Sequence, residues 1–135
     1  MKNKKQNLNG FTITELLIVL AIIGILVMLV LPNQTGLISK AKAKEAELQL
    51  KQAYNMEKYY FNINSKYSAS LNDIDFIQEK LVTEGGKANY KIEIVESSPS
   101  SFKIQARSVT DFNQNGTYNI WEIDQDQNLK ETVKD

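Results

Sequence analysis

Hydrophobic and polar positions follow three successive patterns along the chain. Residues 11–31 are almost all aliphatic and contain one charged side chain, Glu15. From residue 43 to residue 61, apolar residues recur at spacings of three, four and seven positions, which predicts an amphipathic helix with one packing face. From residue 90 onward they recur at every second position, which predicts β-strands with one buried face. The pattern therefore predicts an α+β protein.

The apolar segment is long enough to cross a membrane. As an α-helix its 21 residues extend roughly 31 Å, about the thickness of a bilayer's hydrocarbon core. Lys2, Lys4 and Lys5 precede it without any acidic residue, so we expect the start of the chain to stay cytoplasmic and the rest to be exported. A secretory signal peptide and a plain single-pass anchor are the alternatives. The first small-residue cleavage pattern, at residues 41–43, lies about ten residues too far downstream for a signal peptide.

Glu15 is the residue of this segment that points most directly to a function. An acidic side chain within a membrane segment is costly, so by default it indicates a functional site. It needs a cationic partner or polar surroundings, and no Lys or Arg lies between Phe11 and Ser39. The partner must therefore come from elsewhere. The alternative is that Glu15 lies at the level of the lipid headgroups.

We expect the helix to continue beyond the apolar segment. A helix from Phe11 to about Asn62 has 52 residues and a length of roughly 78 Å. Pro32 removes a backbone donor and Gly24 lowers helix propensity, so a kink or local loosening is predicted around these two residues.

Residues 33–62 form the amphipathic half of this predicted helix. We expect its apolar stripe to pack on the rest of the chain and its charged residues to face solvent. The stripe consists of Ala43, Ala46, Leu50, Ala53, Tyr54 and Phe61, and the solvent side carries Lys40, Lys42, Lys44, Glu45 and Lys51.

Residues 63–135 predict a globular head built on an antiparallel meander of three or four strands. The residues at 97–101 and 125–128 are typical of hairpin loops, and Gly85-Gly86 marks a further loop. The fourth strand is predicted at 129–133. Predicted core residues before the sheet are Tyr67, Leu71, Ile74 and Phe76. Within the sheet, one face is expected to carry Tyr90, Ile92, Ile94, Phe102, Ile104, Ala106, Tyr118 and Ile120, and Glu122 continues the last of these spacings.

Composition narrows the chemistry. The chain has 135 residues, with 16 Lys and Arg against 16 Asp and Glu, and contains neither Cys nor His. Disulfide, thiol and imidazole chemistry are excluded, and a net charge of zero gives no broad attraction to nucleic acid. No nucleophile elbow, phosphate loop or dinucleotide fingerprint is present. We expect a protein that is not an enzyme.

One loop has the spacing of a calcium ligand set. Residues 111–122 satisfy the pattern D-x-[DN]-x-[DN]-G-x5-E, in which hard oxygens wrap an ion and a glycine permits the sharp turn. Both flanks read as strands rather than helices, and two asparagines lower the ligand charge. The alternative is an ordinary Asn/Asp/Gly turn. The predicted calcium ligands are Asp111, Asn113, Asn115 and Thr117, with Glu122 or Asp124 closing the shell.

The first 32 residues resemble the class III signal of type IV pilins and type II secretion pseudopilins. The resemblance rests on a lysine-bearing leader, the sequence GFTITE at 10–15, and an aliphatic run with Gly24 and Pro32. It implies a leader at 1–10, cleavage of the Gly10–Phe11 bond by a prepilin peptidase, and methylation of the new amino group of Phe11. It also implies that Glu15 neutralises the amino terminus of a neighbouring subunit, and that the segment from Gly24 to Pro32 can melt on assembly.

The sequence therefore predicts a prepilin. It has a leader at 1–10, a transmembrane and polymerisation helix at 11–32, the amphipathic half at 33–62 and a head at 63–135. The expected precursor spans the cytoplasmic membrane in contact with lipid, and the product is an extracellular or periplasmic filament. The expected partners are other subunits, the peptidase and an inner-membrane assembly platform. Alternatives are a type II secretion pseudopilin and, from another class, a single-pass anchored calcium-binding domain.

Overall fold

The computed structural model describes residues 9–30 and 34–135, which divide into two compact units, Met1–Gln34 and Thr35–Asp135. The second is the larger and contains all four strands. The predicted kink at Pro32 and most of the predicted leader lie outside the described residues.

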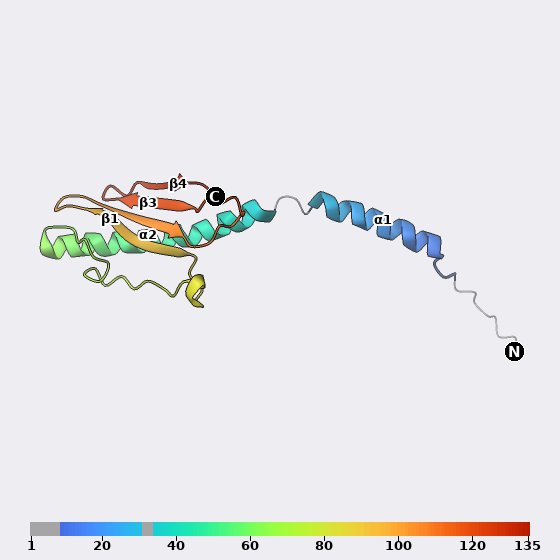
Figure 1. The fold of residues 1–135 in the computed structure, drawn as a ribbon, viewed down its shortest axis with the longest axis horizontal. Helices are drawn as coiled ribbons and strands as arrows, with labels where there is room; N and C mark the ends of the chain where they lie inside the picture. Colours follow the sequence, from blue (N-terminus) through green and yellow to red (C-terminus); the bar gives the residue numbers. More distant parts are fainter. Residues whose placement is uncertain (1–8, 31–33) are drawn as a thin grey trace, which may run out of the picture. The chain divides into compact units, whose positions relative to one another are not determined.

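The first unit is built on one helix, α1, which spans Ile13–Val30 (Figure 1). It starts two residues later than predicted, because Thr12 acts as the cap, as shown below. The helix runs without interruption through Gly24. None of its residues is buried, and its aliphatic side chains lie on every side. Such a helix has no single packing face of its own.

Helix α2, at Gln34–Asn64, carries the predicted stripe. Ala43, Ala46, Leu50 and Ala53 are buried, and Tyr54 and Phe61 pack against the core as half-buried side chains. The helix ends two residues later than predicted, where Ser65 adopts φ 56° and its N–H bonds the Phe61 carbonyl at 2.8 Å. A left-handed residue at this position is a common way to stop a helix.

One charged residue of α2 does not face solvent as predicted. The Glu45 carboxylate is half-buried and accepts two hydrogen bonds from Asn89, at 2.7 Å from the backbone N–H and 2.7 Å from the side-chain amide. Because Asn89 immediately precedes the first strand, this pair fastens the helix to the start of the sheet.

The sheet is a four-stranded antiparallel meander, as predicted, in the order β1-β2-β3-β4 (Figure 1). The strands are β1 at Tyr90–Ser97, β2 at Phe102–Ser108, β3 at Ile120–Asp124 and β4 at Leu129–Val133. The first loop is one residue shorter than predicted because Ser97 pairs with Phe102. Helix α2 lies along one side of the strands. The core joins the two through Ala46, Leu50, Ala53, Tyr67, Ile74, Phe76, Tyr90, Ile92, Phe102, Ile104, Ala106 and Ile123.

The inward face of β3 was predicted wrongly. Tyr118 and Ile120 were expected on the inner face, whereas Asn119 and Ile123 are buried and Trp121 packs against the core. Register explains the inversion: Trp121 pairs with Ala106 and Ile123 with Ile104, and directly paired residues of antiparallel strands share a face.

A fully bonded asparagine makes this phase of β3 stable. The Asn119 side-chain carbonyl accepts from the Tyr90 hydroxyl at 2.8 Å. Its amide donates to the Glu131 carboxylate at 2.7 Å and to the Val133 carbonyl at 3.0 Å. A buried polar group costs little when its hydrogen bonds are satisfied. Asn119 therefore joins β1, β3 and β4 from inside the core.

The segment from Ser65 to Asn89 connects α2 to β1 and covers one end of the core. Tyr67, Ile74 and Phe76 are buried, as predicted. The short 3-10 helix η2, at Val82–Glu84, leads into the predicted glycine loop. A side chain at Gly86 would collide with the Lys80 backbone, so only glycine fits there.

A glutamine side chain closes the outer edge of β1. The Gln78 amide donates to the Tyr90 carbonyl at 3.1 Å and accepts from the Ile92 N–H at 2.8 Å. It thus takes the place that a neighbouring strand would fill.

Glu57 is an acidic residue on the buried stripe of α2 that the sequence analysis did not identify. Its side chain is fully buried. One carboxylate oxygen accepts from the Ser68 N–H at 3.1 Å, and the other has no hydrogen-bond partner among the described residues. Burial raises the pKa of Glu57; the Ser68 hydrogen bond opposes the shift and the nearby charge of Asp73 adds to it.

We predict that Glu57 makes the stability of the Thr35–Asp135 unit fall as the pH rises. A raised pKa means that the folded state holds the proton more tightly than the unfolded state. Stability is therefore greatest below the unfolded pKa of about 4.5 and declines as the pH rises through the folded pKa. In Glu57→Gln this part of the decline should be absent, and Tm at neutral pH should rise. Thermal unfolding of the original protein and of Glu57→Gln between pH 4 and 8 measures this pH dependence. Parallel curves of Tm against pH for the two proteins would contradict the prediction.

We also predict that Asn119→Ala destabilises the same unit by about 1–3 kcal/mol, because the buried Tyr90 hydroxyl and two partners on β4, Glu131 and Val133, lose their hydrogen bonds. Chemical denaturation measures the change. The exposed Asn72 is the matched control, and its replacement by Ala should change stability by less than about 0.5 kcal/mol. Equal effects at the two positions would show that the Asn119 network contributes nothing.

Candidate functional site

The amino end of α1 is closed by a reciprocal hydrogen-bonded cap. The Glu15 carboxylate accepts from the Thr12 N–H at 2.7 Å and from the Thr12 hydroxyl at 3.0 Å. In return, the Thr12 hydroxyl oxygen accepts from the Glu15 N–H at 3.2 Å. This is the capping box formed by Thr or Ser and a Glu three residues later. The spacing Thr12–Glu15 carries this signal in the sequence, whereas the prediction rested only on the charge of Glu15.

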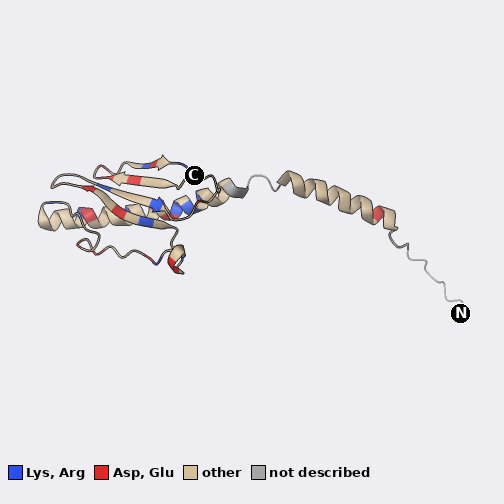
Figure 2. Cartoon of the chain, in the orientation of Figure 1, with Lys and Arg blue, Asp and Glu red and all other residues tan. Residues whose placement is uncertain are grey.

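The cap fixes where the Glu15 charge lies. Glu15 occupies the first turn of α1, where the positive end of the helix dipole favours a carboxylate. All the hydrogen bonds to it within the described residues come from Thr12 and reach a single oxygen, Oε2. In Figure 2 this helix carries red near one end and no blue, in agreement with Glu15 as its acidic residue and with the absence of Lys and Arg from its sequence. A cation for Glu15 therefore has to come from outside α1.

The predicted cleavage site immediately precedes this cap. Gly10 and Phe11 are exposed and lie outside regular secondary structure. The Phe11 side chain is 91% exposed. A peptide bond in an exposed stretch without regular secondary structure suits a protease, because the backbone is free to enter an active site.

The surface of α1 is the most apolar feature of the first unit. Among the described residues, α1 is the one helix long and apolar enough to cross a membrane. Its large side chains, from Leu16 to Val30, are between 47% and 77% exposed. An apolar surface that encircles a helix marks contact with lipid or with other protein, because water would have to cover it otherwise.

The first half of the predicted calcium loop is held together by its own side chains. Asp111 accepts from the backbone N–H groups of Asn115 at 3.2 Å and Gly116 at 2.6 Å. The Asn113 side chain accepts from the Asn115 N–H at 2.9 Å, and the Asn115 side chain accepts from the Thr117 N–H at 2.7 Å. These are the local turns that Asp and Asn favour.

The two residues expected to close the calcium shell are engaged elsewhere. Glu122 accepts from the Gln105 amide at 3.0 Å on the sheet. Asp124 accepts from Asn128 and from the Asp126 N–H, and so holds the turn between β3 and β4. Over the described ranges 9–30 and 34–135, no group of three acidic, His or Cys residues is placed to hold a metal ion. The structure therefore brings together Asp111, Asn113, Asn115 and Thr117 but not Glu122 or Asp124, and calcium binding stays a prediction.

Comparison with known proteins gives a consistent result. Residues 5–31 match the family model described as the prokaryotic N-terminal methylation motif. The chain is similar to the type IV major pilin protein PilA of Myxococcus xanthus, with 37% identity over 83 residues, covering 62% of this chain and 36% of that protein. It is also similar to the type IV wide pilus major component PilA4 of Thermus thermophilus, with 32% identity over 100 residues, covering 72% of this chain and 71% of that protein.

Two features define a pilin-like protein. One is an apolar amino-terminal helix with a capped acid in its first turn, and the other is a helix packed on a four-stranded antiparallel meander. The chain belongs to the type IV pilin family. Its match spans about a third of the Myxococcus relative and about seven tenths of the Thermus relative. Both relatives are named as major pilus components, which does not favour the pseudopilin alternative.

If the loop at 111–124 binds calcium, titration of the Thr35–Asp135 unit with calcium chloride at millimolar concentration should release or absorb heat. Calcium binding also predicts a rise in Tm, since a ligand that binds only the folded state stabilises it. Both effects should be lost in Asp111→Asn, which keeps one oxygen acceptor but removes the charge. Magnesium chloride at equal ionic strength is the control. Titration without heat, together with an unchanged Tm, would leave the loop as a turn without a metal function.

Proposed function

We propose that the chain is the structural subunit of a type IV pilus-like filament. In this proposal it is made as a single-pass precursor in the cytoplasmic membrane and cut between Gly10 and Phe11. It then polymerises through α1, which leaves the Thr35–Asp135 heads outside. The observation that carries the proposal is the aliphatic surface of α1, exposed on every side and interrupted by one acid, Glu15.

The surface of α1 requires two successive environments. Lipid covers it in the precursor, because α1 and the residues just before it approach the length of the hydrocarbon core. Outside the membrane, an apolar helix of this kind is stable only when other apolar surface covers it. Copies of α1 supply such surface, and an assembly of many copies related by one repeated operation forms an open filament.

Cleavage supplies the cation that Glu15 lacks. Cutting the Gly10–Phe11 bond removes the three leader lysines and leaves 13 basic against 16 acidic side chains. It also creates an α-amino group at Phe11, and methylation of that nitrogen keeps its positive charge. Among packed aliphatic helices this amino group and a carboxylate from another copy attract strongly, since low-dielectric surroundings screen little. Glu15 thus selects how far one subunit is displaced from the next.

The cap on α1 prepares Glu15 for that contact. Thr12 bonds Oε2, which limits the rotamers that the side chain can adopt before assembly. Less conformational entropy is then lost when a neighbouring amino group binds the carboxylate.

The proposal includes three kinds of partner besides other subunits. A prepilin peptidase cuts and methylates the precursor, an inner-membrane platform drives assembly, and membrane lipid surrounds α1 before it. We assign no catalytic role to the chain. The absence of His and Cys from the sequence and the pilus names of both relatives support this.

We predict that Glu15→Gln blocks filament assembly but leaves membrane insertion and leader removal intact. The substitution keeps the size of the side chain and removes the charge that pairs with the Phe11 amino group. Surface filaments, counted by electron microscopy after shearing, should fall by about tenfold or more, because charge pairs in apolar surroundings are weakly screened. Glu15→Asp keeps the charge and should retain part of the assembly. Normal filaments from Glu15→Gln would rule out this role.

Mass spectrometry of the mature amino terminus provides the matching check on processing. The proposal expects a chain that begins at Phe11 and carries one methyl group, in both the original protein and Glu15→Gln. An intact Met1 would instead favour the single-pass anchored domain.

A further inference from the structure

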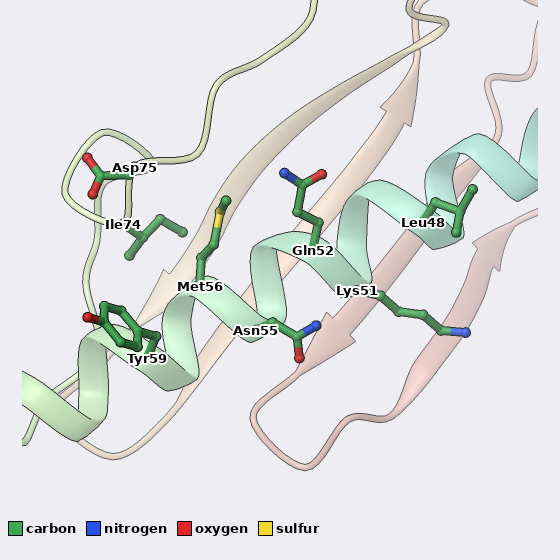
Figure 3. A pocket seen from close by; sticks show the side chains of 8 residues that line it. All are labelled: Leu48, Lys51, Gln52, Asn55, Met56, Tyr59, Ile74 and Asp75. Carbon is green, nitrogen blue, oxygen red and sulfur yellow. The ribbon is translucent and has the colours of Figure 1, made fainter.

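Beside the outer flank of α2 lies a groove that the fold itself leaves unfilled. It has a volume of about 580 Å³ and opens to solvent along the helix. Figure 3 shows Met56 from α2 and Ile74 from the turn above pointing toward each other, with Tyr59 beside them. The remaining lining residues are Leu48, Lys51, Gln52, Asn55 and Asp75.

The groove lies on a second, exposed apolar face of α2. Leu48 and Tyr59 are 68% and 69% exposed, although large apolar side chains normally avoid water. They are separated by eleven residues, about three helical turns, and so share one side of the helix. This side faces away from the buried stripe that includes Leu50 and Ala53. The floor of the groove, formed by the half-buried Met56 and the buried Ile74, belongs to the edge of the core.

A second copy of this chain is the partner that the geometry favours. Subunits of an open filament meet through two different patches, because a repeated operation that does not close places one patch of each copy against another patch of the next. The first turns of α2 carry such a second patch. Leu37 and Ile38 are adjacent and are 68% and 51% exposed. By contrast, the exposed Val95 on the sheet has no exposed apolar neighbour in sequence, so it does not form such an apolar pair.

Charge at both patches agrees with this pairing. Asp75, at the rim of the groove, is exposed and forms no ion pair within the part of the chain that the structure describes. Lys40 follows Leu37 by three residues, which places both on neighbouring positions of the helix surface. Lys40 is also exposed and forms no ion pair with any described residue. One patch thus has a cation, Lys40, beside an apolar pair, and the other has an anion, Asp75, at the rim of an apolar groove.

We propose that the groove binds the first turns of α2 from a second copy of the chain. Leu37 and Ile38 enter between Leu48 and Tyr59, and Lys40 approaches Asp75. This inference rests on the proposed filament, whose contacts along α1 it extends to the head. The two patches are separated by about 15 residues of α2, so the copies in this contact are displaced by roughly 22 Å along the helix. Phe11 and Glu15 are four residues apart, which is about 6 Å, so the groove receives a more distant copy than the one paired through Glu15.

Cysteine cross-linking of filaments tests the contact, and the chain is suited to it because it contains no cysteine. A double variant with Leu37→Cys and Tyr59→Cys is assembled and treated with a short bismaleimide. Because each copy then presents both patches, the expected product is a ladder of covalent multimers on a denaturing gel. Leu37→Cys alone and Tyr59→Cys alone should give no ladder. Filaments of the double variant that yield only monomers or dimers would overturn the proposal.

A matched pair controls for random encounters within the filament. Val95→Cys combined with Leu37→Cys places the second thiol on the sheet, at a side chain that is also exposed, and should give no ladder. A ladder of equal yield from this pair would also overturn the proposal.

Two further arms separate this inference from the proposed function. If the double variant fails to assemble alone, Leu37→Cys copies and Tyr59→Cys copies are mixed together as a minority with original subunits. The expected product is then a dimer of one Leu37→Cys copy and one Tyr59→Cys copy. If no dimer forms in such filaments, the groove contact is wrong while the filament proposal stands. If the original chain forms no filaments, the proposed function itself fails.

Discussion

An aliphatic surface that surrounds α1 is the constraint on which the rest of the protein depends. The buried apolar stripe of α2 packs on the sheet and the connecting segment within the same unit. A helix that is apolar on every side cannot bury all of its surface in this way, and lipid or other copies of the chain have to cover it. The unit that contains the sheet forms a core of its own, which is closed by α2, the connecting segment and three of the strands. The two units therefore differ in what covers their apolar surface: α1 requires outside cover along its whole surface, whereas the unit that contains the sheet has a core of its own.

Two carboxylates occupy positions where the surrounding pattern is apolar, and the protein treats them differently. Glu15 lies at the exposed start of α1, and Thr12 holds one of its oxygens. Its charge is therefore retained and oriented. Glu57 is enclosed in the core with one oxygen unpaired, and its surroundings favour the protonated form. The first carboxylate suits recognition of a cation, whereas the second makes the head sensitive to pH.

Periodicity was sufficient to predict the two helical segments, though as one continuous helix, an antiparallel meander of three or four strands and most of the core, because these depend on long runs in which many residues agree. It failed where one hydrogen-bonded side chain outweighs the local pattern. Asn119 is polar but satisfied by three partners, and this inverted the predicted face of β3. Glu57 also lies on the buried stripe although it is polar, and one of its oxygens accepts a hydrogen bond from the Ser68 N–H. The calcium pattern could place Asp111 near Asn115, but only the register of β3 decides where Glu122 lies.

The Gln78 amide has a consequence for crowding. Heads that are held side by side at very high local concentration are at risk of joining through open sheet edges, which pair with any strand that approaches. Gln78 occupies the edge of β1, and the opposite edge strand, β4, carries Lys130 and Glu131 near its centre. Charged residues on an edge strand discourage further strands from adding. The sheet is thus protected at both margins, which keeps a dense array of heads from fusing into an aggregate.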